Sequence, residues 1–469
     1  MTLARVWIAL AALCSGTALA AGTPAWMVWA AAGAGAGALA IRRRPLLGVV
    51  GLAAVAFAAG AVGGVVRSME RLPLKALAVG VPSCDFSGRV LEQAGGLGTL
   101  VELAVASCDA RGQVVDGGAV IVDGTIGDAG APIHGRGWLV PLGESSFGRA
   151  QERAGAAARL DIEQVEVSPV PPGPLAVAAA LRGGVRTTAD GIGGRRGALL
   201  LGLTIGDTSR VDGATIELFR DAGLSHLLAV SGSNVAIVVG ALALLAQRLA
   251  LRSRLAVALA GLVLFVLVVG PDPSVLRAAI MGGIAVVALV WGRPADPLHT
   301  LGLALIAVIA IRPGMIHSVG LHLSAAATAG IVLWTRRLAG RLDVLPSVVA
   351  IPLAATLAAQ WAVAPIVIAT FGRISIVGPV ANVLAIAAVV PATVLGLAGG
   401  VVDALVAGWG SALAQTAAPF AGWILAVGDA FGGRAWSAVA VPRWWAIVLA
   451  IPVVVSAGRE LRRQARVTV

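Results

Sequence analysis

The stretch from Phe219 to Val235 reads FRDAGLSHLLAVSGSNV, and the rest of the chain is best understood from it. An amphipathic approach leads into an apolar segment at roughly 224–247, which carries His226 and a Ser-Gly-Ser-Asn interruption at 231–234. Polar groups in an apolar span usually face a bundle interior or a water-filled cavity. Gly232 permits close helix approach or local unwinding, and the neighbouring hydroxyls can satisfy freed backbone groups. The stretch therefore predicts a membrane segment that borders a polar interior.

The composition of the whole chain also indicates a membrane protein. Of its 469 residues, 58% are apolar and 13% are charged, and the mean hydropathy is +0.91. A soluble domain of this length carries about twice that charge. The composition therefore excludes an ordinary soluble globular protein and predicts an α-helical polytopic membrane protein.

About twelve apolar stretches are long enough, or nearly long enough, to span a bilayer. The region 344–428 is interrupted by prolines and glycines, so we expect broken or re-entrant helices there. The interruptions are Pro365, Gly378-Pro379, Pro391 and Gly399-Gly400. The stretches lie at 6–22, 24–41, 46–66, 224–247, 255–271, 275–292, 300–312, 318–334, 344–371, 374–399, 400–428 and 436–457.

Arginines gather in the connections between these stretches, and an even number of spans separates every cluster from every other. By the positive-inside rule, their common face is cytoplasmic, as are both termini, and the hydrophilic segment after residue 66 lies outside. Residues 1–20 also fit a cleavable secretory signal, whose removal would leave an extracytoplasmic N-terminus and the remaining topology unchanged. The net charge of +11 is thus mostly a topology signal. The clusters are Arg5, Arg42–Arg44, Arg248–Arg254, Arg293, Arg336–Arg341 and Arg459–Arg466.

The external segment changes from long apolar blocks to short β-rich runs punctuated by Gly and Asp. Five or so short strands in about a hundred residues suit a small all-β barrel of the OB type, although the pattern also fits another small β-domain. The predicted strands are Leu77–Val81, Leu97–Ala106, Ala119–Val122, Gly137–Pro141 and Leu160–Val167.

Two of the three cysteines, Cys84 and Cys108, fall in this segment, each within a Ser-Cys-Asp triplet. Because the segment is expected in an oxidising compartment, a disulfide between them is plausible, and closing that loop would contribute about 3–4 kcal/mol. The alternative is two unpaired small core residues. Between Arg67 and Arg182 there are ten basic and thirteen acidic residues, a net charge of −3. This balance does not favour a barrel that grips nucleic acid through a basic groove.

Several ordered blocks resemble the ComEC family of competence proteins, inner-membrane channels that take up single-stranded DNA in transformation. The similarity covers about 200–395, and the β-rich segment lies where that family has an OB-like domain. The first block contains Gly206-Asp207 and the run from Phe219 to Val235 quoted above. The others contain Gly270, Ser274, Arg277-Ala278, Met281, Gly292-Arg293 and Asp296, then Pro313, Ser318, Gly320 and Leu323-Ser324-Ala325, then Gln360, Pro365, Phe371-Gly372-Arg373, Ser375 and Ala381-Asn382.

Three departures from the family pattern matter. Asn234 stands where the family commonly has a histidine, and Leu321-His322 stands where it often has Phe-Gln. Many members also carry a C-terminal metallo-β-lactamase-like domain, whereas this sequence ends at Val469 without a His-x-His-x-Asp-His run. We therefore expect a channel rather than an enzyme, with no cofactor, no metal and no nuclease of its own.

The resemblance implies an inner-membrane channel for single-stranded DNA in contact with membrane lipid. Its implied partners are a DNA receptor, a cytoplasmic helicase-like motor and a separate nuclease. The expected organisation is N-terminal transmembrane helices at 1–66, an extracytoplasmic OB-like domain at 67–185, a channel core at 186–395, and C-terminal helices with a basic cytoplasmic tail at 396–469. The alternatives are a transporter or flippase for another polyanion or envelope precursor, or a non-catalytic membrane assembly protein.

The residues expected to line the path each have an ordinary structural alternative. Arg277 either contacts a phosphate or snorkels to headgroups or pairs with Asp272 or Asp207. His226 is either a pore-lining, pH-responsive donor or a packed interfacial histidine. The pair of Ser231 and His226 is a poor arrangement for intramembrane proteolysis, since both lie on one segment. The intramembrane amides either line a hydrated path or link helices. The full expected set is His226, Ser231, Gly232, Ser233, Asn234, Arg277, Ser324, Gln360 and Asn382.

Overall fold

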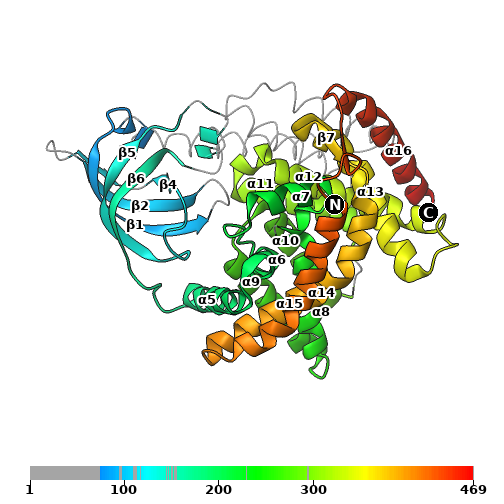
Figure 1. Ribbon diagram of the computed structural model, residues 1–469, viewed down its shortest axis with the longest axis horizontal. Helices are drawn as coiled ribbons and strands as arrows, with labels where there is room; N and C mark the ends of the chain where they lie inside the picture. The colour runs from blue at the N-terminus through cyan, green and yellow to red at the C-terminus, as the bar shows by residue number, and fades with distance from the viewer. Residues whose placement is uncertain are drawn as a thin grey trace.

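The computed structural model describes residues 74–467, apart from 76, 94–97, 109–112, 117, 144, 146, 149–150, 153–155, 229 and 293–294. The predicted spans at 6–22, 24–41 and 46–66, the possible signal and Arg293 lie outside the described residues. Figure 1 shows a β-barrel beside a larger body of helices, with the last helix on the side of that body away from the barrel.

The barrel has five strands in a closed ring and a sixth strand at its edge. The ring runs β1-β5-β6-β4-β2 and closes because β1 also pairs with β2, while β3 extends β2. All pairings are antiparallel except that of β4 with β6. This is the strand arrangement of an OB-type barrel. The strands are β1 Ser83–Gln93, β2 Thr99–Cys108, β3 Gln113–Asp116, β4 Ala119–Val122, β5 Pro132–Val140 and β6 Ala158–Val167.

The strand β1 was missed by the sequence prediction, and the predicted strand Leu77–Val81 is wrong. Strand β1 alternates buried Cys84 and Phe86 with exposed Asp85, so its mean hydropathy is low although its period is that of a strand. The apolar run at 77–81 instead ends a short helical turn whose Ala78 packs into the barrel core. A prediction from mean hydropathy therefore favours the apolar run at 77–81 over the more polar sequence of β1.

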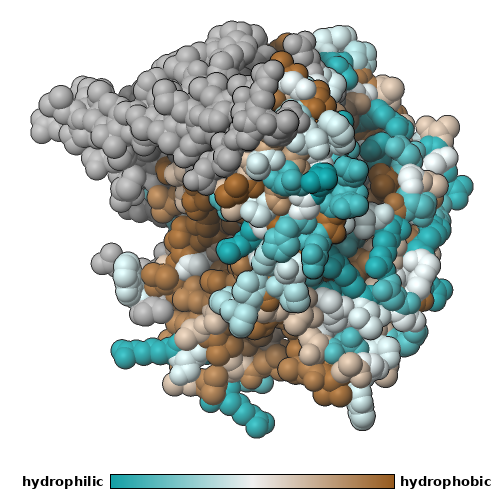
Figure 2. Space-filling model, turned by 90° about the vertical axis from the view of Figure 1, so that its left-hand side faces the viewer, coloured by the Kyte–Doolittle hydropathy of each residue, from teal (hydrophilic) through white to brown (hydrophobic). Residues whose placement is uncertain are grey.

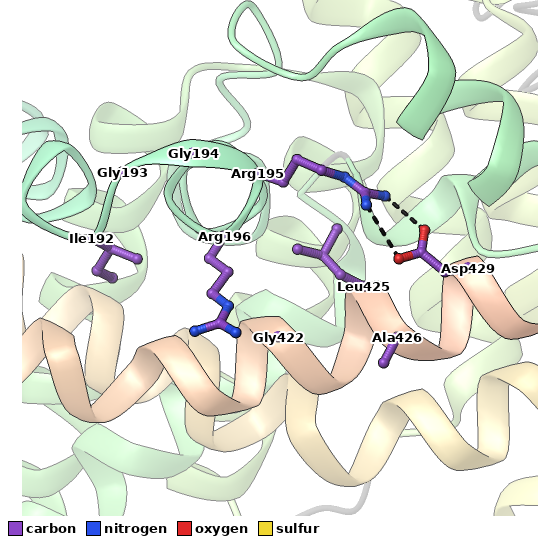
Figure 3. Close-up of a pocket in the computed structure, with 9 residues that line it drawn as sticks. All are labelled: Ile192, Gly193, Gly194, Arg195, Arg196, Gly422, Leu425, Ala426 and Asp429. Atoms are coloured by element: carbon purple, nitrogen blue, oxygen red, sulfur yellow. Dashed lines mark hydrogen bonds and ion pairs between the residues drawn. The ribbon is translucent and has the colours of Figure 1, made fainter.

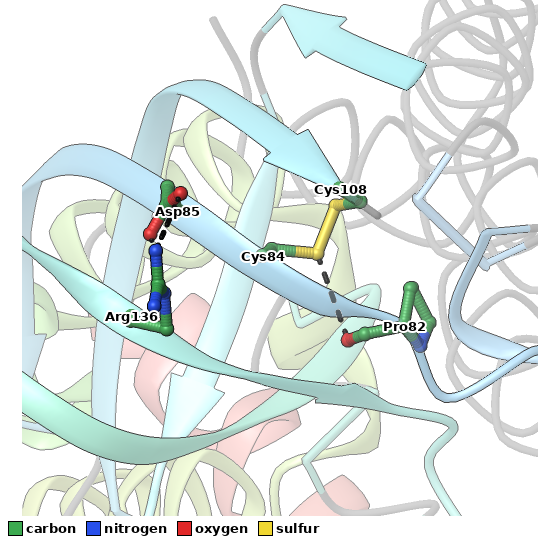
Figure 4. Close-up of a disulfide and its surroundings, with 5 residues drawn as sticks. All are labelled: Pro82, Cys84, Asp85, Cys108 and Arg136. Atoms are coloured by element: carbon green, nitrogen blue, oxygen red, sulfur yellow. Dashed lines mark hydrogen bonds and ion pairs between the residues drawn. A yellow bond between two sulfur atoms is a disulfide. The ribbon is translucent and has the colours of Figure 1, made fainter. Parts of the chain in front are cut away.

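The predicted disulfide between Cys84 and Cys108 is confirmed. These residues are direct cross-strand partners on β1 and β2, with Cα atoms 4.0 Å apart. Both are buried in the barrel core. Figure 4 shows the disulfide together with the exposed ion pair between Asp85 on β1 and Arg136 on the neighbouring strand β5. Gly88 marks a bulge further along β1, where a Cβ would lie 2.4 Å from the carbonyl oxygen of Glu102. The disulfide therefore closes the barrel where β1 begins.

The rest of the described chain is almost entirely helical. Among the described residues, α9, α13, α14 and α15 are long and apolar enough to cross a membrane, and α8, α10 and α11 are apolar but shorter. The total of twelve spans therefore remains a prediction. The helices are α5 Pro174–Ile192, α6 Gly194–Ile205, α7 Gly213–Asp221, η2 Ser225–Leu227, α8 Gly232–Leu245, α9 Leu251–Val269, α10 Pro273–Val290, α11 Pro297–Ile311, η3 Pro313–His317, α12 Val319–Ala339, α13 Ser347–Phe371, α14 Gly378–Leu405, α15 Gly410–Phe431 and α16 Trp445–Val467.

Several helix boundaries differ from those expected. The segment expected as one span from 224 begins its main helix, α8, only at Gly232, after the short turn η2. Helix α13 runs through Pro365, and α14 runs through Pro391 and Gly399-Gly400 to Leu405, so the interruptions expected at these places are wrong. Gly400 instead allows α5 to approach closely, because a Cβ there would lie 2.2 Å from Cγ2 of Val185, and a Cβ on Gly184 would lie 2.1 Å from the carbonyl oxygen of Gly400. Small residues at a helix crossing have this use in membrane proteins.

A short ribbon joins the connection after α13 to the connection after α15. Strand β7, Arg373–Ser375, pairs antiparallel with β8, Ala438–Ala440. Figure 2 views the molecule from the barrel side and shows hydrophilic residues over its right-hand part and a broad apolar surface at its lower left. The molecule thus presents water-preferring and lipid-preferring surfaces side by side.

We predict that replacing both barrel cysteines by serine lowers the free energy of unfolding of the barrel by about 3–4 kcal/mol, because the unfolded segment regains its loop entropy. Hydrogen exchange on the full-length protein in detergent would measure this, as faster exchange of β1 and β2 amides. Cys14→Ser is the matched control. Unchanged protection in the double variant would contradict the prediction.

Candidate functional site

Arg277 lies against the beginning of α8. Ser231 is the N-cap residue of α8, and its side chain makes no capping hydrogen bond. Gly232 follows, and a Cβ there would lie 2.8 Å from Nη2 of Arg277. One turn earlier on α10, Ser274 Oγ donates to the carbonyl oxygen of Val230 at 3.1 Å. The first turn of α10 therefore holds the start of α8, and glycine at position 232 lets the Arg277 guanidinium approach closely.

Hydroxyl groups hold the Arg277 guanidinium in place. Its Nε donates to Ser324 Oγ at 3.1 Å and its Nη1 to Thr328 Oγ1 at 2.7 Å, both on α12. The residue is only 5% exposed. Within the part of the chain that the structure describes, no carboxylate pairs with it: Asp207 pairs with Arg186, and Asp272 forms no ion pair with Arg277. The expected alternative of an ion pair with Asp207 or Asp272 is therefore wrong.

Asn234 and Ser233 differ in their surroundings although they are adjacent. The Asn234 side chain is buried, and its Nδ2 donates to the carbonyl oxygen of Leu203 at 2.7 Å, which links α8 to α6. Ser233 is exposed, and its hydroxyl bonds to that of Ser231. The geometry thus matches the helix-linking alternative for Asn234 and leaves the two serines at an accessible edge of the Arg277 contact.

A second polar cluster contains the other expected residues. His226 on η2 hydrogen-bonds to the side chain of Asn382 on α14, whose Nδ2 donates to Thr356 Oγ1 on α13 at 2.7 Å. One turn further along α13, Gln360 Nε2 donates to the carbonyl oxygen of Ser375 at 2.7 Å. Residues from four segments far apart in sequence therefore meet. Sequence reasoning missed Thr356 in this cluster and Thr328 in the first, because a lone threonine in an apolar helix gives no signal.

The motif residue Asp207 belongs to a chain of ion pairs between the barrel and the helices. Asp128, in the β4–β5 connection, accepts from Arg182 at 3.1 Å and from Arg186 at 3.2 Å, both on α5. Arg186 also lies 3.7 Å from Asp207, the residue after α6 and its cap. Arg182 is mostly buried and donates further to the carbonyl oxygen of Leu267. This chain of charges attaches one side of the barrel to the helical core.

A second ion pair attaches the barrel through β1. Glu92, which is almost fully buried, accepts from Nη1 of Arg312 at 2.6 Å, at the end of α11. Asp272, in the connection from α9 to α10, lies near this pair and keeps a solvent-exposed face. The surrounding protein and the negative charge of Glu92 raise the pKa of the Asp272 carboxyl to about 6, against the opposing charge of Arg312. The carboxylates of Glu92 and Asp272 thus both lie near the one guanidinium of Arg312, at a contact between barrel and helices that we call the seam.

We predict that this seam is strengthened by mild acid. Because the pKa of Asp272 is raised in the folded protein, the stability that its protonation contributes is complete below the ordinary value of 3.8 and is lost as the pH rises through about 6. Thermal unfolding at about pH 5 and about pH 7.5 should show that Asp272→Asn is more stable than the unchanged chain at the higher pH only. Asp123→Asn, on an exposed loop of the barrel, is the control. A pH-independent difference for Asp272→Asn would contradict this.

A hollow of about 540 Å³ lies elsewhere, where the α5–α6 connection meets α15 (Figure 3). Arg195 reaches across to Asp429, with Nη2 and Oδ1 2.7 Å apart, and Arg196 points toward Gly422. None of the expected site residues lines it. Among the described residues, no three His, Cys, Asp or Glu side chains are grouped so that they could hold a metal ion.

An apolar helical body with a cation and several amides and hydroxyls inside it, joined to a small β-barrel, defines the class of the protein as a membrane protein with a polar core. Comparison with known families narrows this class: residues 203–462 match the family described as "Competence protein". Since that match covers more than half of the chain, the protein belongs to the competence protein family, and the resemblance seen in the sequence is confirmed.

Part of the chain is also similar to a known competence-operon protein. The chain is 30% identical over 133 residues to ComE operon protein 3 of Bacillus subtilis (strain 168), which is 28% of this chain and 17% of that protein. The matched part is therefore less than a fifth of that relative's length. No solved structure matches the chain.

Proposed function

We propose that this competence-family protein carries single-stranded DNA across the plasma membrane into the cytoplasm during natural transformation. The observation that carries the proposal is the family match over residues 203–462. That range contains both polar clusters, including Arg277, whose buried charge has no carboxylate partner among the described residues. A family of DNA-uptake proteins and an uncompensated cation in an apolar core together favour a polyanionic cargo.

The proposed path runs past the two polar clusters. Arg277 and Ser324 would contact the strand together with Ser231 and Ser233, while the amides near His226 would keep a second stretch hydrated. A guanidinium suits a passing phosphate because it stays charged and presents several N–H donors in one plane. The segment between Arg67 and Arg182 that contains the barrel has a net charge of −3, so the barrel would guide the strand rather than grip it.

The proposed topology keeps the barrel outside the cytoplasm and both termini inside, or the N-terminus outside if residues 1–20 are removed. The arginine clusters support this, and so does the seam around Glu92. At this seam, the α9–α10 connection with Asp272 and the α11–α12 connection with Arg312 both lie against the barrel. An even number of spans separates these two connections, so they are expected on one face.

Movement of the strand would need energy and partners from elsewhere. The sequence contains no Gly-x4-Gly-Lys-Ser/Thr loop for nucleotide binding. We therefore propose that a helicase-like motor or the membrane gradient drives transport. A DNA receptor would deliver the strand, and a separate nuclease would remove its complement.

We predict that deleting the gene in a naturally competent host abolishes uptake of labelled DNA. Complementation with the unchanged chain restores it, and complementation with Arg277→Ala restores normal membrane abundance but not uptake. Uptake and membrane abundance would be measured in the same cells. Arg252→Ala, at the exposed start of α9, is the matched control and should restore both.

Normal DNA uptake in the deletion strain would contradict the proposal. If that strain instead showed an envelope defect, transport of another polyanion or envelope precursor on the same scaffold would replace DNA transport. A loss of abundance with Arg277→Ala would show that the arginine acts as a structural anchor.

A further inference from the structure

The charge of Arg277 faces the positive end of a helix dipole. Its Nη2 lies at Gly232, the first residue of α8, and this atom has no hydrogen-bond partner among the described residues, whereas Nε and Nη1 bond to α12. The N-terminus of a helix carries about half a positive charge and exposes unpaired N–H groups. Ser231 leaves those groups uncapped. The guanidinium of Arg277 and the positive end of the α8 dipole therefore meet at Gly232.

This arrangement is unfavourable unless a negative group completes it. A buried charge without a counter-charge is costly, and a cation near a helix N-terminus adds repulsion. Anions, by contrast, are bound readily at helix N-termini, where N–H groups point at them. The hydroxyls of Ser231 and Ser233 stand at the same edge, and Ser233 is exposed, so protein atoms do not close the place off.

The donors present fit a tetrahedral oxyanion. A guanidinium with one unused nitrogen, backbone N–H groups at a helix start and two hydroxyls offer donors from several directions, which matches the several acceptor oxygens of a phosphate. Gly232 leaves the space at Nη2 open, because a Cβ there would lie 2.8 Å from that atom. A carboxylate side chain of the protein does not occupy this place among the described residues.

We propose that the N-terminus of α8 and Arg277 form a binding site for one phosphate group at a time. The identity of the ligand as a phosphodiester of the strand rests on the proposed function. Ser324 and Thr328 act as positioning residues, since they fix the guanidinium and leave its third nitrogen directed at α8.

Binding of a fluorescent oligothymidylate to the full-length protein in detergent tests the site. Arg277→Gln and Gly232→Ala should each weaken binding roughly tenfold or more, as expected for loss of a charge-assisted hydrogen bond. Arg277→Gln should also reduce the slope of log affinity against log salt by about 0.7, the value for one phosphate on a single strand. An oligomer with a neutral methylphosphonate backbone should bind equally to all variants.

Two matched controls separate the site from general effects. Arg252→Gln removes an exposed charge at the start of α9, and Gly240→Ala adds a methyl group on α8 with nothing within 4 Å of it. Both should bind like the unchanged chain. Because alanine favours helix more than glycine does, Gly232→Ala tests the occupied space rather than the stability of α8.

Equal affinity and salt slope in Arg277→Gln and the unchanged chain would overturn the proposal, as would an unaffected Gly232→Ala or no binding at all. Repeating the titration in nanodiscs with and without phosphatidylglycerol distinguishes the source of the phosphate. Loss of oligomer binding only when that lipid is present would make the ligand a headgroup and overturn the strand assignment. If binding behaves as expected but the deletion strain takes up DNA normally, the site stands and the proposed function fails.

Discussion

The buried guanidinium of Arg277, whose charge has no carboxylate partner among the described residues, is the constraint that sets the chemistry of the helical core. It joins three helices, because α10 carries it, α12 supplies the hydroxyls of Ser324 and Thr328, and α8 supplies Gly232 at its first turn. Hydroxyls accept hydrogen bonds from its Nε and Nη1, but they leave Nη2 without a partner among the described residues and do not balance its charge. A core that needed only mechanical links would be served by amides such as Asn234, which does link α8 to α6. The uncompensated charge of Arg277 therefore favours a role in binding an anion over a purely structural role.

The barrel and the core are joined by ion pairs on two sides. Asp128 pairs with two arginines of α5, and Glu92 pairs with Arg312 at the end of α11. These pairs are largely shielded from water, so removing one partner would cost more than for exposed pairs. The seam holds the barrel beside the connections that lead into the core, while the cation that suits a phosphate lies in the core itself. The group best suited to bind a phosphate thus lies in the helical body rather than in the barrel.

The sequence predicted the parts that depend on local pattern. The apolar stretches 255–271 and 275–292 became α9 and α10 nearly unchanged, and the cysteine pair was found from its compartment. Strand β1 was missed because its outward residues are polar, and Gly399-Gly400 was taken for a break because its partner Gly184 is more than two hundred residues away. The seam could not be foreseen for the same reason, since its partners meet only after folding. The roles of the expected path residues remain predictions, although the structure does bring most of them into two clusters.

Thiol modification at Ser233 tests most directly whether the unpaired charge faces an accessible space. In a Cys14→Ser background the disulfide leaves Ser233→Cys as the one reactive thiol, and its reaction rates with anionic and cationic methanethiosulfonates can be compared. The account predicts faster reaction with the anionic reagent and loss of that preference when Arg277→Gln is added. Equal rates for both reagents, or a preference that survives Arg277→Gln, would contradict it.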